Sequence, residues 1–378
     1  MPRLKENEEI EGYIIKRKIG EGGNGFVYLA IKKNDINNIE LAIKEIELTK
    51  PGVSAEKSIH EKINKRNAIN LDKMKDYFIR DGYIYFVSTY YNGGTLREYL
   101  NNCKSLLNIK EIQYIIKQII NGLRILNDEK IIHRDIKPEN LLINYDSDQD
   151  LKNKNILKST IIICDYGAGK IIHKTKDKLT KSDKGTIIYR HPKLNEKYFC
   201  EKNDDSYLNA ELDIWSVGII CLELFSGKQL YKYNNKEPDK FKEQLKRETY
   251  DIPLNENTSV ELVSFIDKTL QYEQKNQILM VDLLKEPFIN NEINAFTPFP
   301  KEKAGKKIKN INDKEYIELN FKNGLNFNYN KLFKKVDDRN KELNELINKC
   351  FVDLNKNTLF TDQVLIPVIL DSKELFNE

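Results

Sequence analysis

Runs of β-branched, aromatic and apolar residues predict short strands near the start of the chain. Two of these runs, Tyr13–Ile19 and Phe26–Ile31, flank a cluster of glycines, and a third run covers Glu40–Ile46. Apolar runs on both sides of a glycine-rich turn are typical of a β-hairpin. The sequence therefore predicts strand–turn–strand at the glycines, with a further strand beyond them.

Apolar residues at spacings of three and four predict helices elsewhere in the chain. The clearest stripe ends just before the segment His133–Asn140, which indicates a buried helix that leads into it. The members of this stripe are Ile112, Ile115, Ile116, Ile119, Leu123 and Leu126. A second stripe predicts a helix over Lys331–Val352, and an apolar run predicts a strand over Val364–Leu370.

The glycine cluster is a candidate phosphate-binding loop. Gly20, Gly22 and Gly25 follow the spacing G-x-G-x-x-G, with Val27 two residues later. A dinucleotide-binding fold would place a helix directly after such glycines, whereas a strand is expected here. Glycines allow a turn to lie close over phosphates, with backbone N–H groups available and no Cβ in the way. An ordinary glycine-rich hairpin is the alternative.

The segment His133–Asn140 carries a carboxylate, an ammonium and an amide within a few residues. Asp135 can accept the proton of an attacking hydroxyl, Lys137 can neutralise charge on a moving phosphate, and Asn140 can hold a metal ion. A second metal ligand is expected downstream, and Asp165 follows a buried-strand pattern. These residue types point to phosphoryl transfer.

The motifs and their order resemble those of eukaryotic protein kinases of the serine/threonine type, over about residues 13 to 290. The matching segments are Gly20–Val27 (glycine-rich loop), Ala42–Lys44 (A-x-K), His133–Asn140 (H-R-D-x-x-x-x-N), Asp165–Gly167 (D-F-G, with Tyr for Phe), Gly185–Lys193 (end of the activation segment) and Asp213–Gly218 (D-x-W-S-x-G). The resemblance implies an α+β, two-lobed protein-kinase fold. A small antiparallel sheet with one main helix would precede a larger, mainly helical lobe, and ATP would bind between them.

The resemblance also implies which residues bind ATP. Lys44 would bind the α- and β-phosphates, backbone groups of Thr89–Tyr91 would bind the adenine, and Ser88 would be a small gatekeeper residue that leaves a deep pocket behind the base. Apolar side chains would sandwich the base. The residues expected at the nucleotide are Ile19, Gly20, Glu21, Gly22, Gly23, Asn24, Gly25, Val27, Ala42, Lys44, Glu61, Thr89, Tyr91 and Leu142.

The partner of Lys44 on the following helix is a choice between two carboxylates. Glu56 is nearer in the sequence, and Glu61 lies seventeen residues after Lys44. The spacing of Ile59 and Ile63 along the helix favours Glu61.

The expected activity is transfer of the ATP γ-phosphate to Ser/Thr hydroxyls of protein substrates. Asp135, Lys137, Asn140 and Asp165 would be catalytic, and Asn140 and Asp165 would hold Mg²⁺. Lys137, two residues after Asp135, resembles the serine/threonine-specific members.

Two other functions stay open. One is a pseudokinase-like scaffold that binds nucleotide and partners without catalysis, and the other is a kinase-like enzyme that acts on a small molecule. The scaffold is favoured by two departures from the family pattern, Lys193 in place of Glu and Tyr166 in place of Phe. A complete activation segment and the helix that begins near Asp213 argue against the small-molecule enzyme.

The resemblance implies control by phosphorylation. In the family, an arginine at the position of Arg134, next to Asp135, receives an activation-loop phosphate. Ser182, Thr180 and Thr175 are the candidate sites, and an upstream kinase that acts on Ser182 or Thr180 is an expected partner. Solvent-exposed hydroxyls without a regulatory role are the alternative.

Charge is nearly balanced, with 62 basic and 58 acidic residues and a net charge of +4, so nucleic acid is not expected as a partner. The five cysteines are scattered without C-x-x-C spacing, which suggests free thiols in a reducing compartment. The charged N-terminus does not resemble a signal peptide, and no apolar run approaches ~20 residues, so no membrane span is expected. An intracellular location, cytoplasmic or nuclear, is predicted.

Four parts are expected along the chain: a leader over 1–12, the kinase domain over 13–290, a basic linker over 291–310 and a C-terminal extension over 311–378. The extension is expected either to regulate or to pack on the catalytic domain. Within the kinase domain, polar residues from Tyr145 to Asn155 predict a surface loop insertion.

Overall fold

The computed structural model describes residues 3–22, 25–172, 185–191, 212–231, 249–272, 276–299, 308–311 and 314–320. All of them belong to a compact unit that spans Met1–Leu325, and a second unit covers Asn326–Glu378. The helix and strand predicted after residue 330, and the candidate phosphorylation sites Ser182, Thr180 and Thr175, lie outside the described residues. Phosphorylation at those sites therefore stays a prediction.

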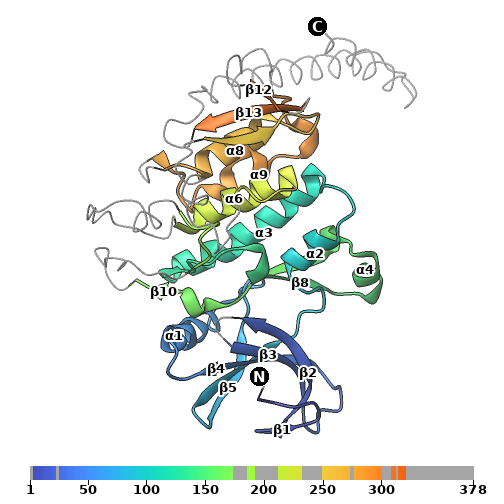
Figure 1. Ribbon diagram of the computed structural model, residues 1–378, viewed down its shortest axis with the longest axis vertical. Helices are drawn as coiled ribbons and strands as arrows, with labels where there is room; N and C mark the ends of the chain where they lie inside the picture. The colour runs from blue at the N-terminus through green and yellow to red at the C-terminus, as the bar shows by residue number, and fades with distance from the viewer. Residues whose placement is uncertain are drawn as a thin grey trace, which may run out of the picture. The chain divides into compact units, whose positions relative to one another are not determined.

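The N-terminal part is a six-stranded antiparallel sheet in the order β1-β2-β3-β4-β6-β5 (Figure 1). The strands are β1 (Glu9–Ile10), β2 (Tyr13–Gly22), β3 (Gly25–Lys32), β4 (Glu40–Glu47), β5 (Met74–Arg80) and β6 (Tyr83–Thr89). Gly22 pairs with Gly25 across the turn of the β2–β3 hairpin, so the predicted strand–turn–strand is confirmed. Leu4 and Ile10 are buried in the same apolar cluster as Tyr13, so residues before the predicted kinase domain pack on the sheet.

One helix, α1 (Val53–Ile63), packs on this sheet. Its buried residues follow helical spacing, at Val53, Glu56, Ile59, His60 and Ile63. Val53 packs in an apolar cluster with Ile46, Met74, Ile84 and Phe86 of the strands. Burial of this face against the sheet fixes which α1 side chains point toward the interior.

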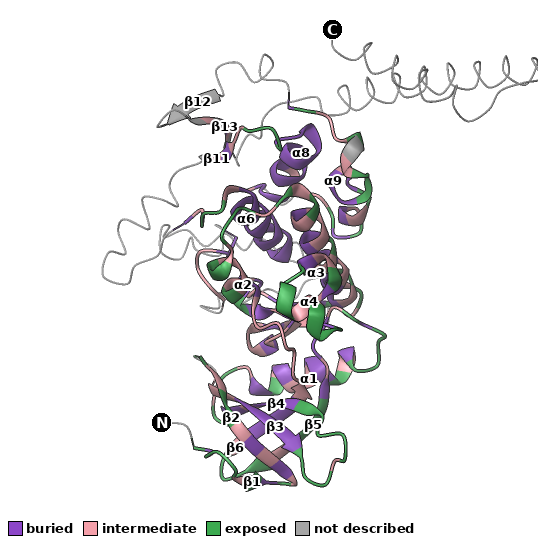
Figure 2. Cartoon of the chain, turned by 90° about the vertical axis from the view of Figure 1, so that its right-hand side faces the viewer, coloured by how far each residue is buried: buried purple, intermediate pink, exposed green. Residues whose placement is uncertain are grey.

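The part that follows is mainly helical, with α2 (Leu96–Asn102), α3 (Ile109–Asp128), α6 (Leu212–Ser226), α8 (Val260–Thr269) and α9 (Pro287–Asn290). All six apolar residues of the predicted stripe are buried in α3. Asn108 and Glu111 form a capping box at the start of this helix, which satisfies N–H groups that would otherwise lack acceptors. Figure 2 shows α6 buried along its length, and α3 and α8 both pack against it. Among the described helices, none combines the length and the apolar character that crossing a bilayer requires.

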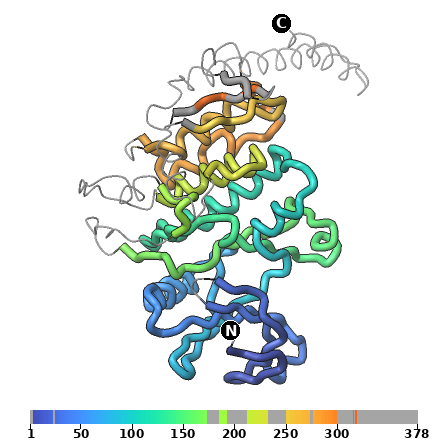
Figure 3. The backbone as a smooth tube through the Cα atoms, viewed as in Figure 1, coloured from blue at the N-terminus to red at the C-terminus, as the bar shows by residue number. Residues whose placement is uncertain are grey.

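A short hairpin of β8 (Leu141–Tyr145) and β9 (Ser159–Ile163) follows α3 and β7 (Ile131–Ile132). The backbone trace in Figure 3 passes from this hairpin to β10 (Lys170–Ile171), which pairs with β7. The segment from Tyr145 to Asn155 was predicted to be a loop, and this is wrong in part because it forms the helix α4 (Asp148–Asn153). Ser147 caps the helix by accepting from the Asp150 N–H, and acidic residues in its first turn favour the helix dipole.

A three-stranded antiparallel sheet, in the order β11-β13-β12, joins a strand that precedes α8 to the last two described strands. Its strands are β11 (Thr249–Pro253), β12 (Ile308–Ile311) and β13 (Lys314–Asn320). Before β12, the Phe299 N–H donates to the Thr258 carbonyl at 3.0 Å, and Phe299 is buried. Both ends of the segment predicted to be a linker, residues 291–310, therefore pack on the preceding domain or carry secondary structure.

Candidate active site

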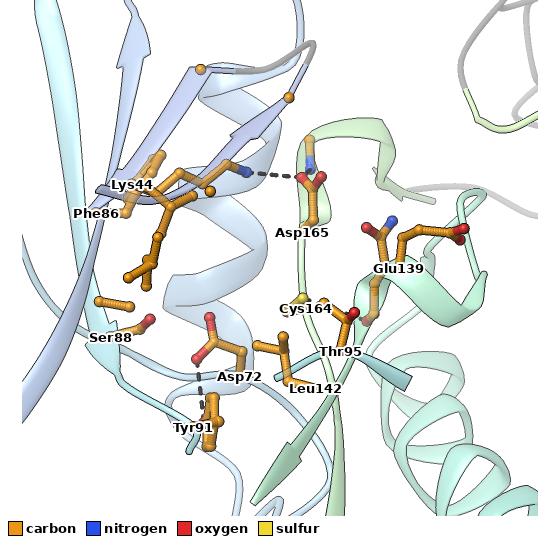
Figure 4. Close-up of a pocket in the computed structure, with 18 of the residues that line it drawn as sticks. Lys44, Asp72, Phe86, Ser88, Tyr91, Thr95, Glu139, Leu142, Cys164 and Asp165 are labelled. Carbon is orange, nitrogen blue, oxygen red and sulfur yellow. Dashed lines mark hydrogen bonds and ion pairs between the residues drawn. The ribbon is translucent and has the colours of Figure 1, made fainter. Parts of the chain in front are cut away.

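A cavity of about 800 Å³ lies between the N-terminal sheet and the β8–β9 hairpin (Figure 4). It brings together most of the residues predicted from the sequence. These are Ile19, Gly20, Glu21, Gly22, Gly25, Val27, Ala42, Lys44, Thr89, Tyr91, Asp135, Lys137, Asn140, Leu142 and Asp165. Gly23 and Asn24 lie outside the described residues.

The glycine hairpin forms one wall of this cavity. Gly25 has a φ of +146°, and a Cβ at this position would lie 1.8 Å from the carbonyl oxygen of Glu45 on β4. No other residue fits so close to a neighbouring backbone. The β2–β3 turn is thereby drawn against β4, the strand that carries Lys44.

Lys44 lies between two carboxylates. Its Nζ is 2.6 Å from Glu56 Oε1 and 2.8 Å from Asp165 Oδ1. Burial alone would lower the pKa of Lys44, but the Asp165 and Glu56 carboxylates more than offset this and raise the pKa above its ordinary value. For Asp165, burial alone would raise the pKa, and the Lys44 ammonium instead lowers it well below its ordinary value. At neutral pH the lysine is cationic and Asp165 is anionic.

The prediction that Glu61 pairs with Lys44 is wrong. Its side chain is 52% exposed and lies 3.7 Å from Lys57, whereas the Glu56 side chain is 2% exposed. Glu56, Ile59 and Ile63 are three and four residues apart, which places the carboxylate on the same face as the buried isoleucines. Glu61 falls between these positions, on the solvent face of α1. The apolar spacing was the signal that identifies Glu56.

Asp135 is held by three donors from the same loop and from the end of the activation segment. The Thr186 N–H donates to Oδ1 at 2.6 Å, Asn140 Nδ2 donates to Oδ2 at 3.0 Å, and Lys137 Nζ lies 2.9 Å from Oδ2. Lys137 also donates to Thr186 Oγ1 at 2.6 Å. Burial opposes ionisation of Asp135, but the Lys137 ammonium and these hydrogen bonds lower its pKa below the ordinary value. The carboxylate is therefore oriented and ionised.

Asp213 at the start of α6 fixes the backbone that carries Asp135. Its Oδ2 accepts from the His133 N–H and its Oδ1 from the Arg134 N–H, both at 2.8 Å. Arg134 has a φ of +66°, a left-handed conformation that costs a non-glycine residue energy. The hydrogen bonds that these two N–H groups donate to the buried Asp213 carboxylate hold Arg134 in place.

Tyr166, which replaces the usual Phe, is fully buried. Its ring packs edge-on against His60 and His133, with centroids 4.9 and 5.5 Å away. Its hydroxyl donates to the carbonyl oxygens of Asp72, at 3.2 Å, and Ile163, at 3.1 Å. The extra hydroxyl thus has acceptors, and the aromatic packing is kept.

Asn140 and Asp165 are brought together by the β8–β9 hairpin. The backbone N–H of Cys164 donates to the carbonyl oxygen of Asn140 at 3.0 Å, directly before Asp165. The Asn140 amide nitrogen donates to both Asp135 O and Asp135 Oδ2, which directs its oxygen Oδ1 elsewhere. An amide oxygen and an ionised carboxylate are oxygen donors of the kind that Mg²⁺ prefers, so these residues fit the predicted ion.

Arg97 on α2 joins the segment His133–Asn140 to α6. Its Nε donates to Glu139 Oε1 at 2.8 Å and its Nη1 to Glu223 Oε1 at 2.6 Å. Its Nη2 donates to the Tyr189 hydroxyl, which in turn donates to Glu223 Oε2 at 2.6 Å. Arg97 belongs to no motif considered in the sequence, and a single arginine in a helix gives no signal of such a role.

Residues of the N-terminal part that were not singled out from the sequence also line the cavity. They include His60 on α1, Asp72 before β5, Met74 on β5, and Phe86 beside Ser88 on β6. Asp72 was not singled out from the sequence, because it stands outside every motif.

Comparison with known proteins places this geometry in a family. The family model for the protein kinase domain matches residues 13–289. Among curated relatives, serine/threonine-protein kinase Nek5 of Homo sapiens is 28% identical, over 75% of this chain and 37% of that protein. Calcium-dependent protein kinase 4 of Plasmodium falciparum is 28% identical, over 75% of this chain and 50% of that protein.

Serine/threonine-protein kinase atg1 of Dictyostelium discoideum is also 28% identical, over 75% of this chain and 40% of that protein. The chain thus spans half or less of the length of each of these relatives. The two parts of the fold, a curled antiparallel sheet with α1 and a mainly helical part, are those of the two-lobed kinase fold.

Proposed function

The chain belongs to the protein kinase family, and we propose that it is an active, ATP-dependent serine/threonine kinase that phosphorylates protein substrates. One observation carries this proposal. The Lys44–Asp165 pair, at 2.8 Å, and the Asp135–Lys137 pair, at 2.9 Å, line the same cavity. One cavity thus contains a lysine and a carboxylate suited to bind phosphates and a metal ion, together with a proton acceptor and a second cation.

Each pair has a separate task in phosphoryl transfer. Lys44, oriented by Glu56, would bind the nucleotide phosphates as a point charge. Asp135 would accept a hydrogen bond from the acceptor hydroxyl and take its proton as the new P–O bond forms. Lys137 would stabilise negative charge on the transferring group, because its ammonium is held beside Asp135 before the reaction begins.

Asn140 and Asp165 would hold Mg²⁺ through an amide oxygen and a carboxylate oxygen. A bound Mg²⁺ neutralises charge on the β- and γ-phosphates. Asp165 is suited to this task because Lys44 keeps its pKa low, so that it stays ionised at physiological pH.

The pseudokinase-like scaffold receives little support from the described residues. Lys44, Asp135, Asn140 and Asp165 are all present and line the cavity. The Tyr166 hydroxyl has two backbone acceptors, so its presence does not disturb the turn after Asp165. Lys193, the other departure, lies outside the described residues.

The decisive experiment is transfer of ³²P from Mg²⁺-ATP to a generic protein substrate by the full chain and by Asp135→Asn. We expect transfer by the full chain and a loss of about 10²-fold or more in Asp135→Asn, because an amide cannot take the proton. Phosphoamino-acid analysis of the product should give phosphoserine or phosphothreonine.

Asp146→Asn is the matched control, because it makes the same chemical change at an exposed residue away from the cavity. Binding of ATP without transfer by the full chain would favour the scaffold. Phosphotyrosine alone would contradict the serine/threonine specificity.

A further inference from the structure

Asp72 is a buried carboxyl group that the proposed phosphoryl transfer does not use. Its side chain lines the cavity, near Ser88, Leu142 and Cys164 (Figure 4). The residue is 9% exposed. Within the residues that the structure describes, no lysine or arginine forms an ion pair with it, and the Lys44 ammonium is bound by Glu56 and Asp165.

Asp72 is held in place by two hydrogen bonds of its backbone and one of its side chain. Its N–H donates to the Ile163 carbonyl on β9 at 2.8 Å, and its carbonyl oxygen accepts from the Tyr166 hydroxyl at 3.2 Å. Its Oδ1 accepts from the Tyr91 hydroxyl at 3.3 Å. A side chain anchored in this way is preorganised to bind a ligand.

Strand pairing places Asp72 near Ser88, away from Lys44 and Asp165. Ala42, Ser88 and Met74 lie side by side across β4, β6 and β5, and Asp72 stands two residues before Met74. Figure 4 shows Asp72 beside Ser88 and Leu142, and Lys44 and Asp165 farther along the cavity. A nucleotide whose phosphates lie at Lys44 would therefore extend its base toward Asp72.

An unpaired buried carboxylate costs stability unless a donor compensates it. Burial raises the pKa of Asp72 to about 6, although the Tyr91 hydroxyl, the Lys44 charge and the Ser88 hydroxyl act in the opposite direction. At pH 7.5 the group is mostly ionised and accepts hydrogen bonds only. A ligand with an N–H donor would satisfy it, whereas a carbonyl oxygen would be repelled.

We propose that Asp72 is a specificity-determining residue that accepts a hydrogen bond from the 6-amino group of a purine nucleotide and disfavours a 6-oxo purine. This inference rests on the proposed binding of ATP in the cavity. The amino group carries two N–H donors, so one can bind the backbone at Thr89–Tyr91 and the other can bind Asp72. Hydrogen bonds to charged groups are strong enough to give selectivity of about tenfold or more.

The test compares ATP with inosine triphosphate, in which the 6-amino group is replaced by a 6-oxo group. Dissociation constants are measured by calorimetry for the full chain, Asp72→Asn and Asp72→Val. We expect the full chain to prefer ATP by at least tenfold. Asp72→Val should lose most of that preference, and Asp72→Asn, whose amide can donate to the 6-oxo group, should lose it or reverse it.

Asp76→Asn is the matched control, because it makes the same change on β5, where the carboxyl group accepts from the Tyr13 hydroxyl at 2.9 Å. It should keep the preference of the full chain. Equal ATP preference in the full chain and in both Asp72 variants would overturn the assignment. Failure of the full chain to bind either nucleotide would instead overturn the proposed function, and this inference with it.

A second measurement needs no variant. Protonation of Asp72 removes its charge and gives it a donor, so the preference of the full chain for ATP should fall between pH 7.5 and pH 5.5. Both nucleotides carry the same triphosphate, so titration of the phosphates cancels in the ratio. The other titratable groups around Asp72 are Lys44 on β4, Glu56 on α1, Tyr91 after β6, and Cys164 and Tyr166 after β9. A ratio that stays constant over this range would contradict the role of Asp72.

Discussion

The Glu56 carboxylate binds the Lys44 ammonium across the gap between α1 and β4, with Oε1 2.6 Å from Nζ. The same ammonium lies 2.8 Å from Asp165 Oδ1. One lysine thus links a helix of the N-terminal part to the turn that follows β9. The position of α1 therefore decides whether Lys44 is held toward the cavity.

Replacement of Glu56 by Gln is expected to lower kcat/KM for ATP by about 10- to 100-fold. The substitution removes one charged hydrogen bond to Lys44, worth ~1.5–3 kcal/mol. Glu61→Gln is the matched control on the same helix, and it should leave kcat/KM unchanged because Glu61 is 52% exposed. Steady-state kinetics with a generic protein substrate measures both. A larger loss in Glu61→Gln would contradict the pairing.

Local patterns were enough to predict the elements that carry the chemistry. The glycine hairpin, the buried helix α3 and the segment around Asp135 each depend on a few neighbouring residues, and each is found where the sequence predicts it. The prediction of Glu61 was wrong because the choice between Glu56 and Glu61 depends on which face of α1 packs on the sheet. The spacing of Ile59 and Ile63 contained that information, but it was interpreted in favour of Glu61.

Other features could not be predicted because they depend on contacts between distant segments. Asp72 meets Tyr91 and Ile163 through strand pairing, and a single aspartate outside any motif does not reveal such partners. The same holds for β13, which pairs with β11 some sixty residues earlier in the chain, for example Ile317 with Ile252. Strand pairing at long range follows from the assembled fold and leaves little trace in local sequence.

Asp213→Ala is expected to destabilise the chain by about 2–5 kcal/mol and to abolish most of the transfer activity. The substitution leaves the backbone N–H groups of His133 and Arg134 without their acceptor, and each buried unsatisfied donor costs ~1–3 kcal/mol. Arg134 would also lose the contact that holds its left-handed backbone. Urea unfolding followed by circular dichroism measures the change. Asp213→Asn keeps one acceptor oxygen, so its free energy of unfolding should lie between those of the full chain and of Asp213→Ala. An Asp213→Ala variant as stable as the full chain would contradict the role of Asp213.

Arg97→Ala should destabilise the chain by about 3–5 kcal/mol, because it leaves the Glu223 carboxylate, whose side chain is 6% exposed, without its cation. The double variant with Glu223→Gln should recover part of this loss, since it removes the stranded charge. Arg66→Ala is the control, because the Arg66 side chain is 46% exposed and such pairs contribute little. Thermal unfolding of the three variants tests this, and a double variant no more stable than Arg97→Ala would argue against a stranded charge.

Ile317→Ala is expected to cost about 2–4 kcal/mol of unfolding free energy. Ile317 of β13 is fully buried and pairs with Ile252 of β11 and Ile308 of β12, so the strand is part of the folded domain. Ile69→Ala is the control, because Ile69 is 72% exposed and its loss creates no cavity. Equal stability of the two variants in urea would show that β13 contributes nothing to the domain.

Asp72→Asn is expected to stabilise the free protein at pH 7.5 and to have little effect at about pH 4. The pKa of Asp72 is raised from its ordinary value to about 6 in the folded protein, so the folded state holds the proton more tightly than the unfolded state. Stability contributed by this group is therefore greatest at low pH, falls as the pH rises from about 4 to about 6, and stays low above that. Asn cannot ionise, so it avoids this loss.

The expected gain for Asp72→Asn is about 2–3 kcal/mol at pH 7.5, from ~1.4 kcal/mol for each unit of pKa shift. Urea unfolding of the full chain and the variant at both pH values measures it. Lys44, Glu56 and Cys164 also face this site, and their charges are the same in both proteins, so the difference reports Asp72. A variant that gains stability without nucleotide but loses its preference for ATP would show that the carboxyl group is kept for binding at the expense of stability. Destabilisation at pH 7.5 would show that the ionised group is already satisfied within the protein.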